Sequence, residues 1–194
     1  MVLPAISRAA VVAVGLALAI FGVAGCATED DECCWPTGAV GTRYAEVSGP
    51  TGPLGDCTGD ERDRDGGRQQ DFEQGAIYWT PDTGAWEVYG QIGDEYENAG
   101  GPASALGWPV TGELSTPNGV GRFNRFQHGN IYHSPAGTYP VYGAIFDAYA
   151  QQGYENGRLG FPTSGEQDTD EGRRSNFQGG WIEWNSSTGA ITVG

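Results

Sequence analysis

Short stretches of alternating apolar and polar residues recur along this chain and predict β-strands. Ile77 and Trp79 alternate with polar or amphipathic neighbours, and Ile182 and Trp184 do the same further along. Each stretch is followed by a turn, such as residues 81–84, and then by a second alternating stretch. The pattern therefore predicts a series of β-hairpins.

A second apolar pattern, with a spacing of four residues, precedes each predicted hairpin. The pairs with this spacing are Val40 and Tyr44, Ile92 and Tyr96, and Ile145 and Tyr149. Because residues four apart lie on one face of a helix, the pattern predicts helices over 90–99 and 143–152. The first pair lies in a glycine-richer frame, so we expect its helix to be weaker.

A tetrapeptide links each predicted helix to its hairpin and shows that the chain is repetitive. Leu106-Gly107-Trp108-Pro109 recurs as Leu159-Gly160-Phe161-Pro162, and in altered form as Leu54-Gly55-Asp56-Cys57, at spacings of 52 and 53 residues. Glutamate, arginine and phenylalanine follow in the same order each time: Glu61, Arg68 and Phe72; Glu113, Arg122 and Phe126; Glu166, Arg173 and Phe177. A fixed period of this size predicts a repeat architecture with units 38–89, 90–142 and 143–194.

Each unit is expected to contain a short helix, a Leu-Gly turn, an irregular loop and a β-hairpin. A lone hairpin is only marginally stable in water. Neighbouring units must therefore cover each other's apolar faces. The expected fold is α+β and mainly β, with three tandem repeats in a compact array. The sequence leaves open whether the array closes around a pseudo-threefold axis or forms an open stack.

These motifs resemble the LGFP repeat of actinobacterial cell-envelope proteins. Residues 159–162 spell the family signature, and residues 106–109 exchange one aromatic residue for another. The resemblance covers residues 38–194, and it departs from the family at Asp56 and Cys57. It implies a role in the cell wall, where such repeats are thought to hold their carrier on wall polysaccharide. No enzymatic domain accompanies the repeats in this chain.

The first 37 residues differ in composition from the repeats. Residues 1–25 contain one charge, Arg8, and an apolar run of the length of a signal h-region, which predicts a secretory leader. Residues 23–26 resemble a bacterial lipobox, so cleavage is expected to leave a lipid-carrying Cys26. An ordinary signal peptide or an uncleaved anchor are the alternatives. Residues 26–37 are expected to form an acidic tether between membrane and repeats.

Three further cysteines, Cys33, Cys34 and Cys57, follow the leader. In an oxidising compartment a disulfide is expected. Adjacent cysteines pair poorly with each other because of disulfide geometry. Our hypothesis is therefore a bond from Cys33 or Cys34 to Cys57, which would compensate for the missing proline at 57. Three free thiols are the alternative. A metal site is not expected, because a fourth ligand is lacking.

The net charge is −15, and the sequence contains no lysine. A polyanion such as nucleic acid, or an anionic membrane surface, would be repelled by this charge. Neutral polysaccharide and cationic partners remain compatible with it. The sequence indicates no cofactor.

A catalytic set is not apparent in the sequence. His128 and His133 lie five apart, hence on opposite faces of a strand, and His133 takes the place of Trp79 and Trp184 in the other units. The glutamates recur once in each unit, which argues for a repeated structural duty, such as pairing with the recurring arginines. We therefore expect a non-enzymatic protein.

Aromatic rings are the other candidates for function, because their flat faces suit sugar rings. Trp108 and Phe161 follow the Leu-Gly turns and are ligand candidates, although packing between units is the alternative for both. Trp181 stands where Ala76 and Asn130 stand in the other units, so it is a candidate surface contact. The candidate ligand-binding set is completed by the repeated charged residues Glu113, Glu166, Arg122 and Arg173.

Together these features predict an extracytoplasmic lipoprotein, anchored to the outer face of the cell membrane, that binds cell-wall glycan. The glycan would be peptidoglycan or arabinogalactan. The alternative is an adaptor that binds an envelope enzyme or transporter. A hydrolase with an unrecognised site is a third possibility.

Overall fold

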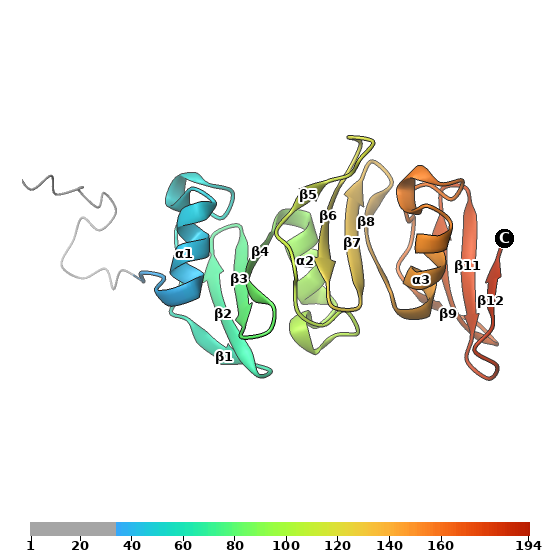
Figure 1. Ribbon diagram of the computed structural model, residues 1–194, viewed down its shortest axis with the longest axis horizontal. Coiled ribbons are helices and arrows are strands. Elements are labelled where there is room, and N and C mark those ends of the chain that lie inside the picture. The colour runs from blue at the N-terminus through green and yellow to red at the C-terminus, as the bar shows by residue number, and fades with distance from the viewer. Residues whose placement is uncertain (1–33) are drawn as a thin grey trace, which may run out of the picture. The chain divides into compact units, whose positions relative to one another are not determined.

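The computed structural model describes residues 34–194. Three α-helices and three four-stranded antiparallel sheets alternate along this part of the chain (Figure 1). The leader, the lipidation site Cys26 and the alternative disulfide partner Cys33 lie outside the described residues. Among the helices of residues 34–194, none has the length and apolar character needed to cross a membrane.

Each repeat contains one helix followed by four strands in sequential order. The first repeat holds α1 (Gly38–Glu46), β1 (Arg62–Arg64), β2 (Gly67–Phe72), β3 (Gly75–Thr80) and β4 (Gly84–Tyr89). The second holds α2 (Gly90–Asn98), β5 (Leu114–Ser115), β6 (Arg122–Phe126), β7 (Gly129–Ser134) and β8 (Gly137–Tyr142). The third holds α3 (Gly143–Gln151), β9 (Gln167–Asp168), β10 (Gly172–Phe177), β11 (Gly180–Asn185) and β12 (Ile191–Val193).

The expected fold class is confirmed, and the three hairpins β3–β4, β7–β8 and β11–β12 form where the alternation predicted them. The segment expected to be an irregular loop instead supplies two further strands to each sheet. In the first repeat, β2 buries Gln69 and Gln70, each 2% exposed. Because buried polar residues interrupt the hydrophobic alternation, the sequence pattern concealed this strand.

Each of the two later helices packs against two sheets. α2 contacts β7 and β8 of its own repeat and also β3 and β4 of the first repeat. α3 likewise contacts β11 and β12 of its own repeat and β7 and β8 of the second. We call the sheet face that contacts the helix of the same repeat its inner face, and the opposite face its outer face. The outer faces of the first two sheets are therefore covered by the helix of the next repeat.

The hydrophobic core consists of three clusters that follow this arrangement. One cluster joins α1 to the inner face of the first sheet through Val40, Tyr44 and Ile77. Another contains Tyr78 from the first sheet's outer face, Ile92 and Tyr96 from α2, and Ile131 from the second sheet's inner face. The third repeats this pattern with Tyr132, Ile145, Tyr149 and Ile182. Among the described residues, extensive element contacts join consecutive repeats only, which favours the open array over a closed one.

The Leu-Gly tetrapeptide is fixed by the same set of contacts in all three repeats. Its leucines are completely buried: Leu54 and Leu159 are 0% exposed and Leu106 is 1% exposed. The next residue is a glycine with a positive φ, for example 70° at Gly107, where a side chain would be strained. The carbonyl oxygen of this glycine accepts a hydrogen bond of 2.7 Å from a helix tyrosine. The pairs are Tyr44 and Gly55, Tyr96 and Gly107, and Tyr149 and Gly160.

A Phe-Glu or Phe-Gln pair of the sheet completes these contacts of the tetrapeptide. We call the whole set of contacts the tyrosine clamp. Phe177 stacks on Tyr149 with ring centroids 4.6 Å apart, and the Gln178 side chain accepts a hydrogen bond of 3.0 Å from the Phe161 amide. The second repeat has the same contacts through Phe126 and Gln127, and the first has them through Phe72 and Glu73. Helix, tetrapeptide and sheet are thus locked together once in each repeat.

A disulfide replaces the proline of the first tetrapeptide. Cys34 and Cys57 are bonded, with their Cα atoms 5.9 Å apart. Cys57 makes the same isolated bridge to Phe72 that Pro109 makes to Phe126 and Pro162 makes to Phe177. The bond therefore joins the segment before α1 to the first tetrapeptide, as one of the two expected pairings proposed.

Removing one hydroxyl of the clamp tests its contribution to stability. Tyr149→Phe keeps the ring that stacks on Phe177 but leaves the Gly160 carbonyl without its donor. We expect a loss of about 1–3 kcal/mol in the free energy of unfolding, because an unsatisfied buried acceptor carries a desolvation cost. Urea unfolding followed by tryptophan fluorescence measures this loss. Tyr154→Phe, at an exposed ring of the same repeat, is the control, and equal stability of the two variants would contradict the clamp.

The disulfide is expected to stabilise the first repeat. The double variant Cys34→Ser/Cys57→Ser should lose about 3 kcal/mol, because the bond closes a loop of 23 residues in the unfolded chain. Thermal unfolding with and without reductant measures this effect. The wild type should shift to lower temperature on reduction, whereas the double variant should not respond. A wild type insensitive to reductant would show that the bond contributes nothing.

Candidate functional site

The aromatic residues of the later tetrapeptides lie between neighbouring repeats. Trp108 is 9% exposed and Phe161 is 4% exposed. The Trp108 ring lies edge-on to Tyr78 of the first sheet, with ring centroids 6.5 Å apart. Phe161 belongs to the cluster that holds Phe123 and Tyr132 of the second sheet. Neither ring keeps a face on which a sugar could stack, so both positions fit the packing alternative and not a ligand contact.

The exposed Asp56 takes the corresponding position in the first repeat. Within residues 34–194, no sheet precedes this repeat, so an aromatic ring at 56 would have no outer face to cover. The departure of the first tetrapeptide from the other two follows from this position in the array.

A pocket of about 380 Å³ lies beside the start of α3. Glu166 and Arg173 supply its charged groups, and Tyr142 and Trp184 supply its aromatic rings. Arg173 and Trp184 are opposite each other on β10 and β11, while the first turn of α3 (143–145) closes one side. Two charged residues from the candidate set are therefore brought together with an indole ring.

The first repeat has a pocket of about 300 Å³ in the same place. Its lining includes Thr37, Glu61, Arg68, Trp79 and the start of α1. Arg68 and Trp79 are again opposite each other on adjacent strands. The Arg68 guanidinium donates a hydrogen bond of 2.8 Å to the Glu61 carboxylate, which confirms the expected pairing in this repeat.

The second repeat places the corresponding residues together at the start of α2. Tyr89 donates a hydrogen bond of 3.1 Å to Glu113 Oε1, and Arg122 Nε lies 3.8 Å from the same oxygen. Arg122 is opposite His133, which replaces the tryptophan of the other repeats. Each repeat thus presents a carboxylate, a guanidinium and a ring beside the start of its helix. We call this set the helix-start site.

In the third repeat the arginine of the helix-start site pairs with a different carboxylate. Arg173 Nε lies 3.1 Å from Asp168 Oδ1, so its salt bridge is to that residue and not to Glu166. The expected pairing of Glu and Arg therefore forms in the first two repeats. Glu166 instead interacts with the Tyr142 hydroxyl.

Partial burial shapes the electrostatics of these sites. Burial raises the pKa of Glu166, and the nearby Arg173 opposes this rise. Burial, reinforced by Glu113, raises the pKa of Tyr89 to about 12. The pKa of Tyr142 is raised by burial and by Glu166. Both tyrosines therefore stay protonated at neutral pH and can donate a hydrogen bond beside the carboxylate.

Trp79 and Trp184 of the helix-start site were not among the ligand-binding residues expected from the sequence. One sequence feature could have identified them, namely a constant spacing from the arginine of the site. The ring lies eleven residues after this arginine in every repeat: Arg68 and Trp79, Arg122 and His133, and Arg173 and Trp184. This offset reflects the register of the two strands that carry them. Because the sequence did not predict the strand before each hairpin, the register between these two strands could not be inferred from it.

Trp181 lies on the outer face of the third sheet, away from the helix-start site. The Arg174 guanidinium lies over its ring at 4.2 Å from the centroid. Arg174 also forms an ion pair with Glu183, which stands where Tyr78 and Tyr132 stand on the other outer faces. The half-buried Trp181 is therefore part of a polar face, and its role as a surface contact stays a prediction.

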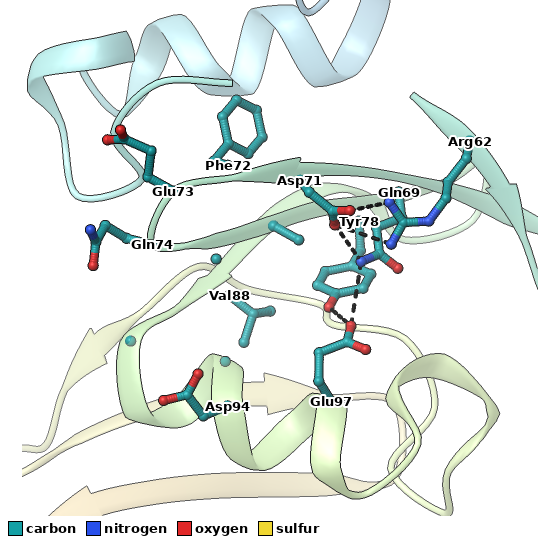
Figure 2. A pocket seen from close by; sticks show the side chains of 14 residues that line it. Arg62, Gln69, Asp71, Phe72, Glu73, Gln74, Tyr78, Val88, Asp94 and Glu97 are labelled. Carbon is teal, nitrogen blue, oxygen red and sulfur yellow. Dashed lines mark hydrogen bonds and ion pairs between the residues drawn. The ribbon is translucent and has the colours of Figure 1, made fainter. Parts of the chain in front are cut away.

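A larger pocket, of about 440 Å³, lies between the first sheet and α2. Figure 2 shows Arg62, Asp71, Tyr78 and Glu97 converging on one hydrogen-bonded network, while Glu73 and Asp94 stand apart from it. Arg62 pairs with Asp71, and the Tyr78 hydroxyl donates to Glu97. The second sheet has Phe123 and Arg125 where this sheet has Gln69 and Asp71. The lining of this pocket, at the junction of the first and second repeats, is therefore not part of the recurring pattern.

The two histidines and the possible metal ligands are the remaining candidates for a functional site. His128 is exposed in the turn before β7, whereas His133 belongs to the helix-start site of the second repeat. Over residues 34–194, no three His, Cys, Asp or Glu side chains are placed to hold a metal ion.

Fold and site together define a tandem-repeat protein with a carboxylate, a guanidinium and a ring at corresponding positions in each repeat. The family model of the LGFP repeat matches residues 54–104, 106–157 and 159–194. The chain belongs to the LGFP repeat family. A comparison with curated proteins gives no match. The matched segments begin at the Leu-Gly tetrapeptide, so α2 and α3 lie at the ends of the first two matches, and α1 lies before the first match.

The half-buried Glu166 gives the stability of the protein a defined pH dependence. Its pKa is raised on folding, so the folded protein holds the proton more tightly than the unfolded chain does. The resulting stability is present at low pH and is lost as the pH rises through the folded pKa. Glu166→Gln should therefore gain stability relative to the wild type as the pH rises from 4.5, the ordinary value for glutamate.

Urea unfolding at several pH values between about 4 and 7 measures this difference. Asp170→Asn, at an exposed carboxylate of the same repeat, is the matched control. A Glu166→Gln variant that loses stability relative to the wild type as the pH rises would contradict the assignment.

Proposed function

We propose that this LGFP repeat protein is a non-catalytic binding protein that attaches to neutral polysaccharide of the cell wall. The observation that supports this proposal is the indole-lined pocket beside the helix start, which recurs in the first and third repeats. Recurrence suits a ligand that is itself a repeating polymer, since weak sites gain avidity when several engage one chain.

The groups of the site match the chemistry of a sugar. The indole of Trp184 offers a flat apolar surface for the C–H face of a sugar ring. Glu166 can accept hydrogen bonds from hydroxyl groups, while Arg173 and the Tyr142 hydroxyl can donate them. Because this ring and these polar groups line one pocket, a single sugar residue could contact all of them.

The charge of the protein favours a neutral polymer. The net charge of −15 disfavours nucleic acid and other polyanions, because like charges repel over the Debye length. Hydroxyl-rich wall glycan of the peptidoglycan or arabinogalactan type carries no such penalty where it is uncharged. We therefore assign the cell-wall glycan, and not nucleic acid, as the partner.

The sequence before the repeats supports a location at the outer face of the cell membrane. Its apolar leader, with a lipobox-like segment ending at Cys26, is suited to lipid attachment after export. The acidic residues 29–32 would keep the following segment in solvent. In this proposal the lipid holds one end at the membrane while the repeats bind the wall.

Co-sedimentation with purified, deproteinised wall tests the proposal. Trp184→Ala removes the ring of the third helix-start site and should weaken wall binding about tenfold, the cost typical of a central aromatic contact. Trp181→Ala, which removes a ring from the opposite face of the same sheet, is the matched control and should bind as the wild type does. Circular dichroism confirms that both variants are folded.

The alternatives have different outcomes. A wild type that stays in the supernatant but captures a defined protein from envelope extract would favour the adaptor over the glycan-binding protein. Release of soluble fragments from the wall would favour a hydrolase. Equal wall binding by Trp184→Ala and Trp181→Ala would separate the activity from the helix-start site.

A further inference from the structure

The helix-start site differs between repeats at three positions that lie together. The first is the ring, which is Trp79, His133 or Trp184. The second is the residue opposite this ring on the neighbouring strand, which is Ala85, Thr138 or Ile191. The third is the second residue of the helix, which is Ala39, Gln91 or Ala144. All three positions are apolar or aromatic in the first and third repeats and polar in the second.

The three polar residues of the second repeat are hydrogen-bonded to one another. His133 Nδ1 lies 2.8 Å from Thr138 Oγ1. The Thr138 hydroxyl in turn donates to Gln91 Oε1 at 3.4 Å. The His133–Thr138 bond needs one proton, which either the imidazole or the hydroxyl can supply. These two hydrogen bonds link β7 and β8 to the start of α2, at the position where the other repeats have an indole.

From this difference we propose that the first and third repeats each bind one sugar of a wall polysaccharide, and that the second repeat is a spacer without a sugar site. The inference rests on the proposed function and adds the number and position of its sites. The protein is then bivalent, and its two sites grip one polymer or two neighbouring strands.

The physical reason lies in the exchange of an indole for a bonded imidazole. In the first and third repeats, Trp79 and Trp184 line open pockets with alanine at the start of the helix, so an apolar sugar face can displace water there at little cost. In the second repeat a sugar would cover the His133–Thr138–Gln91 chain. The imidazole is smaller than an indole and is already hydrogen-bonded to Thr138, which bonds to Gln91 in turn. A sugar there would gain less stacking area and would have to displace existing hydrogen bonds.

Calorimetric titration with neutral oligosaccharides, prepared by partial hydrolysis of deproteinised wall, counts the sites. The wild type should bind two equivalents. Trp79→Ala and Trp184→Ala should each bind one, and His133→Ala should still bind two. On intact wall each tryptophan variant should bind about tenfold more weakly, because it loses the second, intramolecular contact of a bivalent binder.

A gain-of-site variant tests the inference in the opposite direction. The triple substitution Gln91→Ala/His133→Trp/Thr138→Ala gives the second repeat the residues of the first and should raise the stoichiometry from two to three. Trp79→Phe and Trp184→Phe keep an aromatic face and should retain two sites, which separates loss of a ligand contact from a folding defect.

The outcomes distinguish this inference from the proposal beneath it. Three equivalents in the wild type, one equivalent, or loss of a site in His133→Ala would overturn the bivalent arrangement while glycan binding stands. A folded wild type that binds neither the oligosaccharides nor the wall would overturn both.

Discussion

The packing of one helix between two sheets is the constraint on which this structure depends. α2 and α3 each bury one side on their own sheet and the other on the preceding sheet, so the cores of the second and third repeats are shared with the repeat before them. The tyrosine clamp makes this possible. Tyr96 and Tyr149 lie within the clusters, yet each finds an acceptor in a tetrapeptide glycine. A buried hydroxyl would otherwise lose its hydrogen bond to water.

The tetrapeptide and the helix-start site differ in exposure within each repeat, although Trp79 and Trp184 also pack with part of their surface against the core clusters. The tetrapeptide that gives the family its signature is almost wholly committed to packing: its leucines are buried, and Trp108 and Phe161 cover the preceding sheet. The helix-start site uses groups that the clamp does not need. Its residues can therefore change from repeat to repeat, as the exchange of tryptophan for His133 illustrates, while the clamp stays the same.

The ends of the described array show the same logic. In the first repeat the tetrapeptide has no preceding sheet to cover, and Asp56 together with a disulfide at Cys57 replaces the aromatic residue and the proline. In the third repeat no helix covers the outer face, which carries Glu183 and Arg174 in an ion pair. This polar face suits contact with solvent, because an uncovered apolar face would promote association.

The sequence alone determined the repeat, its period, the three helices, the hairpins and the fold class, because each of these follows from local spacing of apolar residues and turn residues. It also showed that a glutamate and an arginine recur at corresponding positions of each repeat, and it indicated Cys33 or Cys34 as the disulfide partner of Cys57. Only the tertiary structure decided that β2, β6 and β10 are strands, since buried polar residues such as Gln69 and Gln70 hide their alternation. It also decided that Trp108 and Phe161 are buried whereas Trp79 and Trp184 line pockets. Exposure of a ring depends on what the neighbouring repeat places against it, and one-dimensional spacing does not contain that information.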